Sequence, residues 1–194
     1  MIPPSEHVHW WFATGFLLLG LCLLARAIVG PDVWDRRPWR AYLWPALVFV
    51  MGLLMFPVQV FFTNSTIHMV AHGSWAQVMM LAGAAHLGLV RGKLKSHYWR
   101  LTMPLALGVS GAAFLIHEQH SWLYTRSAFV HHVAGWTLIV GAIFPLVGTW
   151  RPRSAWVNAG FAVTIVTLAV VLYTARDTAP IFGHFSPQAG IPHR

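Results

Sequence analysis

Six long apolar runs constrain this chain more than any other feature of its sequence. A helix needs about 20 residues to cross the ~30 Å hydrocarbon core of a bilayer. The runs are continuously apolar and do not alternate as the strands of a membrane barrel do, so helices are the predicted spanning form. They cover residues 8–28, 42–62, 67–90, 101–116 (beginning near Tyr98), 130–150 and 155–175.

The predicted fold is therefore all-α: a polytopic integral membrane protein with a six-transmembrane-helix bundle. The bundle takes residues 1–176, and residues 177–194, which are rich in Pro and Gly, form a C-terminal tail on the outer surface. The first run lacks a basic start and carries Glu6, so we expect it to be a retained span and not a signal peptide.

Composition excludes several classes of protein. Hydrophobic residues make up 57% of the chain and charged residues only 9%, against roughly 25% charged in an ordinary soluble domain. This composition excludes a soluble enzyme, a disordered chain and a nucleic-acid-binding domain. The single cysteine, Cys22, lies inside an apolar run and excludes a disulfide or any site built from several cysteines.

Basic residues predict the orientation. With six spans, ten of the thirteen Lys and Arg residues fall on one side, and only Arg126, Arg176 and Arg194 fall on the other. The positive-inside rule makes the basic side cytoplasmic, so both termini are expected outside, in a plasma or cytoplasmic membrane. The expected partners are the lipid bilayer, including anionic lipid, and subunits of a membrane complex, but not nucleic acid. The ten residues are Arg26, Arg36, Arg37, Arg40, Arg91, Lys93, Lys95, Arg100, Arg151 and Arg153.

Histidines carry the functional signal. Ten of the twelve fall at the outer side, and six of these form pairs at one depth on three successive spans. Ionisable side chains at membrane depth are costly and tend to face the protein interior. Of the adjacent pair, only one ring is expected to point inward, because neighbouring helix positions differ by about 100°. The pairs are His68 with His72, His117 with His120, and His131 with His132.

These six histidines predict a metal site, because neutral imidazole is the commonest protein ligand for transition metals. Copper or zinc is the expected ion, and methionines on the second and third spans suit copper. The set is also similar to the histidine boxes of membrane di-iron desaturases, although those boxes lie on the cytoplasmic side. The leading prediction is a membrane metalloprotein that binds or handles copper or zinc near the outer face.

Haem is the first alternative. His72 and His86 are fourteen residues apart on one span, so they share a helix face and differ by ~21 Å in height. On the next span, His117 would match His72 in depth and Met103 would match His86. His with His or Met can ligate haem iron, which predicts a b-type electron-transfer subunit.

Two further functions stay open. Glu118 lies within the second histidine pair and could act as the acid or base of a metal-dependent oxidoreductase or hydrolase on a lipid or quinone. Alternatively, the chain is a structural subunit of a membrane complex, with incidental histidines.

Local sequence features also predict helix packing. Ala84 with Gly88, and Gly108 with Ala112, place small residues four apart and so favour close helix contact. Pro145 removes a backbone hydrogen bond and predicts a kink in the fifth span.

The third to fifth spans resemble the transmembrane protein 45-like family, a domain of unknown function. The resemblance rests on the run from His72 to His86 with its Met pair and Gly83, on the Phe114-Leu115-Ile116-His117 end of the fourth span, and on the later His120 and His131. The first span, from His9 to Gly20, is similar as well. The resemblance implies a polytopic helical bundle with a shared cluster of outer histidines.

Overall fold

The computed structural model describes residues 5–60, 66–116 and 125–176, and these residues form helices and no strands. The predicted all-α fold is therefore confirmed for this part of the chain. The predicted tail, residues 177–194, lies outside the described residues. The elements are α1 (Ser5–Val29), α2 (Pro31–Trp34), α3 (Pro38–Val60), α4 (Thr66–Val90), the short 3₁₀ helix η1 (His97–Leu101), α5 (Thr102–Ile116), α6 (Thr125–Gly141), α7 (Ile143–Gly148) and α8 (Ala155–Tyr173).

Five of the described segments are long and apolar enough to cross a membrane, which is consistent with an integral membrane protein. The α4 helix, with 25 residues, is long enough but does not belong to this set. Its sequence includes His72, Gln77 and His86, which lower its hydropathy. The five segments are Glu6–Val29, Pro38–Val58, His97–Ile116, Ala128–Gly148 and Ala155–Tyr173.

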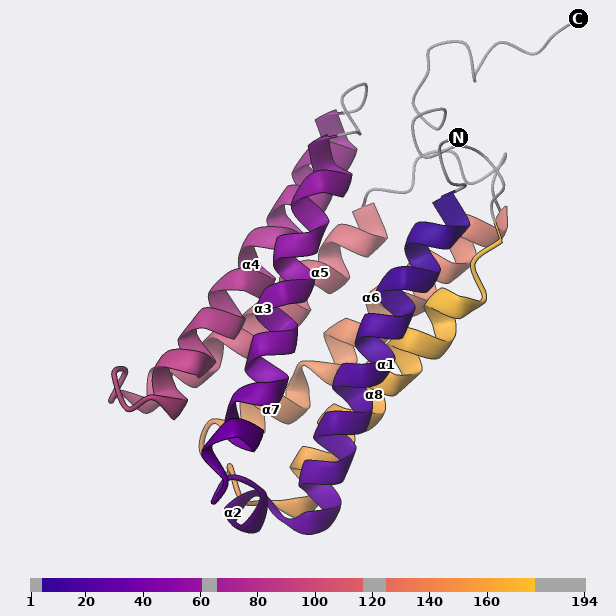
Figure 1. The fold of residues 1–194 in the computed structure, drawn as a ribbon. Coiled ribbons are helices and arrows are strands. Elements are labelled where there is room, and N and C mark those ends of the chain that lie inside the picture. The colour runs from indigo at the N-terminus through magenta and orange to yellow at the C-terminus, as the bar shows by residue number, and fades with distance from the viewer. Residues whose placement is uncertain (1–4, 61–65, 117–124, 177–194) are drawn as a thin grey trace, which may run out of the picture.

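The helices run along one common direction in two closely packed groups (Figure 1). The α3 and α4 helices pack along each other, and so do α1 and α8; α5 and α6 join the two groups. The start of α1 and the end of α8 lie at the same end, where the Trp10 indole N–H donates to the Ala175 carbonyl over 3.3 Å. The segments that follow α1, α4 and α7 lie at the opposite end, the basic end of the bundle.

The fifth predicted span is broken in two. The α6 helix ends at Gly141 and α7 begins at Ile143, so the interruption lies at Ala142, three residues before Pro145. The proline has no N–H to donate, so the helical hydrogen bonding is interrupted there. The interruption falls in the turn before Pro145, and the kink itself stays a prediction.

Small residues do mediate close helix contacts, but not the pairs that their spacing predicts. Ala84 and Ala112 are exposed, and a Cβ built on Gly108 would meet nothing within 4 Å. The close contacts lie elsewhere. A Cβ on Gly83 of α4 would come within 2.5 Å of the Phe49 backbone nitrogen on α3. Four-residue spacing identifies a face of one helix but not the neighbour that covers that face.

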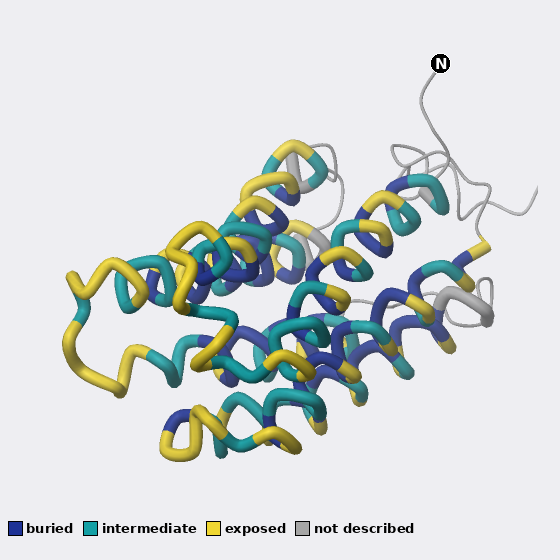
Figure 2. Tube along the Cα trace, turned by 60° about the horizontal axis from the view of Figure 1, so that its bottom comes forward, coloured by how far each residue is buried: buried dark blue, intermediate teal, exposed yellow. Residues whose placement is uncertain are grey.

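Apolar side chains cover the outside of the bundle as well as its core. Figure 2 shows that exposed positions alternate with buried ones along each long helix. The outward side chains include Leu18, Leu54, Val140 and Val163, each about half exposed or more. A helix that is apolar all round suits a membrane and not water. Exposed tryptophans, among them Trp11, Trp39 and Trp150, lie near helix ends, as an interfacial aromatic belt requires.

One ion pair ties α1 to the segment after α2. The Arg26 guanidinium donates to both oxygens of Asp35, from Nη2 at 2.7 Å and Nε at 3.1 Å, and to Asn158 Oδ1 at 2.8 Å. Both side chains are partly shielded, at 16% and 36% exposed. Two-pronged pairs of this kind are the stronger class of charged hydrogen bond.

We expect Asp35→Asn to lower the free energy of unfolding by about 1 kcal/mol, because it removes the charge and one of the two acceptor oxygens. The measurement is the thermal unfolding midpoint in detergent at low and high salt. Asp32→Asn is the matched control, because its pair with Arg153 is 64–80% exposed and should contribute little. An equal effect of the two substitutions would contradict this account of Arg26.

Candidate functional site

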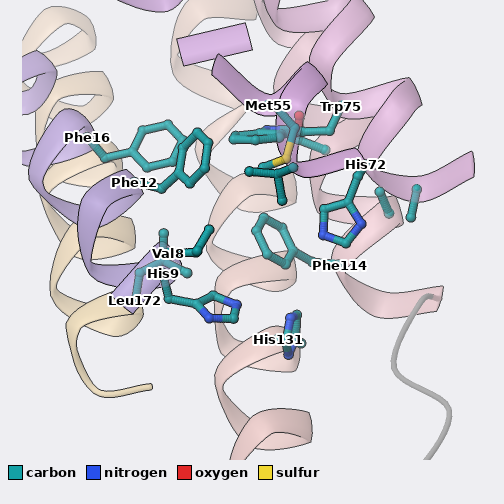
Figure 3. Close-up of a pocket in the computed structure, with 14 residues that line it drawn as sticks. Val8, His9, Phe12, Phe16, Met55, His72, Trp75, Phe114, His131 and Leu172 are labelled. Atoms are coloured by element: carbon teal, nitrogen blue, oxygen red, sulfur yellow. The ribbon is translucent and has the colours of Figure 1, made fainter. Parts of the chain in front are cut away.

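A small pocket, called the outer pocket below, lies at the end of the bundle opposite the basic loops, which the sequence predicts to be the outer end. Three histidines line it, each from a different helix: His9 from α1, His72 from α4 and His131 from α6 (Figure 3). Its volume is about 70 Å³, which suits an ion with a few waters and is far too small for a haem. Segments far apart in the sequence thus bring imidazoles to one place.

His131 is the most deeply buried of the three. It is 5% exposed, and its ring lies 5.6 Å from the Phe114 ring and 5.8 Å from the His9 ring, centroid to centroid. The next residue, His132, is exposed, and its Nδ1 lies 2.8 Å from the Ala128 carbonyl of its own helix. Of this adjacent pair, His131 therefore faces the pocket and His132 faces away from it.

His72 comes from the third predicted span, the first of the three that carry histidine pairs. It lines the pocket in the second turn of α4 and is half-buried. His68 precedes it by four residues on the same helix, but its side chain lies outside the described residues. The predicted ligands His117 and His120, and the predicted acid or base Glu118, also lie outside them.

The pocket walls are apolar and aromatic. Trp75 of α4 packs against Phe12 and Phe16 of α1, with ring centroids 5.3 and 6.0 Å apart. Met55 of α3, 6% exposed, contributes a thioether to the same wall. In such a low-dielectric surrounding a charged imidazolium is costly, whereas neutral imidazole and thioether are cheap to bury.

One buried hydroxyl in this pocket has no partner. Ser110 of α5 is 1% exposed, and its Oγ makes no hydrogen bond within the described part of the chain. Buried polar atoms are nearly always hydrogen-bonded to protein or ordered water. The Ser110 hydroxyl is therefore available to a water or another polar group in the pocket.

The imidazoles are not arranged as a finished metal site. Among the residues that the structure describes, no group of three or more His, Cys, Asp or Glu side chains is placed to hold a metal ion. His9 and His131 come nearest. Two imidazoles on one tetrahedral metal, with metal–nitrogen bonds of about 2.1 Å, hold their ring centroids roughly 5 Å apart. The observed 5.8 Å is close to this value.

A second and larger cavity lies at the basic end. Its volume is about 450 Å³, and its lining includes Arg26, Trp44, His86, Arg100 and Met103. The Trp44 and His86 rings meet edge to face at 4.7 Å. The two residues of the predicted inner haem pair, His86 and Met103, thus line one cavity. His72, fourteen residues from His86, lines the other pocket, and its predicted haem partner His117 lies outside the described residues.

Sequence reasoning did not select three members of the outer pocket. His9 sits at the outer depth of the histidine pairs, but its place near the N-terminus suggested a solvated residue. Met55 belongs to the run of methionines on the second span, where gap filling is the usual role. Ser110 gave no signal, because a serine in an apolar helix becomes informative only once its burial and lack of a partner are known.

No protein-family model, curated protein or solved structure matches this chain. The resemblance to the transmembrane protein 45-like family therefore stays a prediction.

Proposed function

We propose that this protein is a membrane metalloprotein that binds a copper or zinc ion at the outer end of its bundle through His9, His72 and His131. The observation that carries the proposal is that these three imidazoles, from α1, α4 and α6, line one pocket of about 70 Å³. The three helices must have the correct shift and rotation relative to one another for their imidazoles to share this pocket. Incidental interfacial histidines need no such convergence.

The chemistry of the pocket supports a transition metal. Imidazole suits copper and zinc, and the Met55 thioether on the same wall suits copper in its reduced state. A metal ion accepts lone pairs from neutral imidazoles, so the site needs no buried imidazolium. A water on the metal would satisfy the Ser110 hydroxyl, which has no partner among the described residues.

The rings of His9 and His131 are already neighbours. No three His, Cys, Asp or Glu side chains of the described residues are placed to hold a metal, so binding requires side chains to change rotamer, as they commonly do when a ligand binds. The sequence predicts three further ligands, His68, His117 and His120, whose side chains lie outside the described residues. His132 faces away from the pocket and has no part in this site.

We also propose that α4 is the sixth span, which places both termini outside and the basic loops in the cytoplasm. The α4 helix packs along α3, and its 25 residues match the length that a bilayer requires. Its two histidines, His72 and His86, line cavities of the bundle, whereas Gln77 is exposed.

Cysteine labelling tests this topology. In a Cys22→Ser background, we expect an impermeant maleimide to label Glu6→Cys and Thr174→Cys in right-side-out vesicles, and Lys93→Cys only after lysis. A chain in which α4 does not cross would place Glu6 and Thr174 on opposite sides. Labelling of Lys93→Cys alone in intact vesicles would show the inverted orientation.

Metal analysis of the intact protein tests the proposed function. The chain is purified in mild detergent, stripped with a chelator, and titrated separately with Cu(I), Cu(II) and Zn(II). We expect elemental mass spectrometry to find about one copper or zinc per chain after gel filtration, in a fraction that elutes as a single species. A single-species fraction that retains neither metal would refute the proposal.

A further inference from the structure

The basic end of the bundle carries a cavity with two parts. The inner part, of about 450 Å³, has apolar walls that include Leu23, Trp44, Val157 and Phe161. It adjoins a polar recess of about 560 Å³ lined by Arg151, Arg153 and Ser154. Arg26, Asp35, Arg100 and Pro152 line both parts, so they mark the place where the two meet. Together the parts make a funnel with a basic mouth and an apolar interior.

The charges at this mouth do not balance. Arg26 is paired with Asp35 and Arg153 is paired with Asp32. Arg100 and Arg151 make no ion pair with any acidic side chain that the structure describes. Two guanidinium groups are therefore left facing a shared recess. Arg100 is partly buried, so an anion would gain more from it than from a fully solvated arginine.

Tryptophans near the mouth favour a position at the lipid headgroups. Exposed Trp39, Trp99 and Trp150 stand at this end of the helices, as residues at a membrane interface do. Basic pockets between helices on the cytoplasmic side are suited to anionic lipid headgroups. The funnel thus matches an amphiphile in both polarity and position, with the headgroup at the arginines and a chain in the apolar interior.

Neither potential haem ligand in the inner part presents its ligating atom. Met103 is 2% exposed, and the unpartnered Nε2 of His86 is fully covered by protein. To ligate a haem iron, the Met103 sulfur and the His86 Nε2 would both have to face the open volume of the cavity. The arginines and the apolar walls, in contrast, are already in place for a lipid.

We propose that this funnel is a binding site for an anionic phospholipid, whose phosphate is held by Arg100 and Arg151 and whose acyl chain enters the cavity beside Trp44. The site is independent of the outer histidine pocket, and either proposal can fail without the other.

Native mass spectrometry of delipidated protein in neutral detergent tests the site. The probes are phosphatidylglycerol, phosphatidylcholine with the same chains, and glycerol phosphate. We expect phosphatidylglycerol to bind about tenfold more tightly than phosphatidylcholine, because the choline ammonium offsets the phosphate charge and is repelled by the two arginines. The double variant Arg100→Gln with Arg151→Gln should lose that preference. Glycerol phosphate should not compete, because it lacks the chains.

The matched control is Arg36→Gln with Arg37→Gln. These two arginines are exposed at the same end and line neither part of the funnel, so the lipid preference should be unchanged. Equal binding of the two phospholipids, or equal loss in both double variants, would overturn the proposal. Displacement by glycerol phosphate would assign a free-anion site instead. A visible haem absorption band in protein made with haem available would assign the cavity to haem.

Discussion

His72→Ala combined with His131→Ala should abolish metal binding by a chain that still folds. The two substitutions remove imidazoles from two of the three helices that line the outer pocket. Loss of a partner that merely orients a metal ligand costs about 10–100-fold in affinity. Loss of two ligands should therefore lower affinity by more than 100-fold. Competitive titration with a chromophoric copper or zinc chelator gives the affinity, and elemental mass spectrometry gives the metal content.

His132→Ala is the matched control for that experiment, because it removes an imidazole next to His131 that faces away from the pocket. We expect its metal content and affinity to equal those of the wild type. Single variants His9→Ala and His131→Ala should each weaken binding. Full metal content in the double variant, or equal losses from His131→Ala and His132→Ala, would contradict the assignment of ligands.

Gly83→Ala should be the most damaging small substitution in the bundle core. The added Cβ would lie 2.5 Å from the Phe49 backbone nitrogen and 2.7 Å from its Cα, so α3 and α4 would have to separate. Backbone atoms cannot turn aside as a flexible side chain can. Forced packing of this kind typically costs about 1–3 kcal/mol. The thermal unfolding midpoint in detergent should fall by several degrees, and less protein should accumulate in the membrane.

Gly108→Ala is its control on the neighbouring helix α5. A Cβ there meets nothing within 4 Å, so we expect stability within about 0.5 kcal/mol of the wild type. The same two variants also test the contact between the helices. If Gly83→Ala is as harmless as Gly108→Ala, α3 and α4 do not approach each other as described here.

Helix positions could be predicted well from the sequence because each span is a local property of about 20 residues. The apolar run 155–175 became α8 (Ala155–Tyr173), and the run 67–90 became α4 (Thr66–Val90). Pro145 also acts locally, on the carbonyls of the turn before it, so the break before α7 followed from the residue alone. Composition alone does not identify α4 as a span, because His72 and His86 lower its mean hydropathy although both line cavities of the bundle.

The candidate site was only partly predictable, because the amino-acid sequence of one helix does not identify the helices that pack against each of its faces. His72 and His131 were selected from their depth, and both line the outer pocket. The inward choice between His131 and His132 needed the rotation of α6 about its axis, which packing against α5 and α8 decides. His9 could join the site only through the placement of α1 beside these helices. The same reason explains why Gly83 makes a close contact and Gly108 does not.

The sequence by itself determined that this chain forms long apolar helices and that basic residues gather at one end of the described bundle, with His9, His72 and His131 at the other. These are one-dimensional properties, set by the solvation of each segment and by the alternation of the chain across a bilayer. Only the tertiary structure decided which three imidazoles share a pocket and which arginines lack an acidic partner. Those outcomes depend on how far each helix is rotated and shifted against its neighbours, and close packing of many weak contacts sets that register.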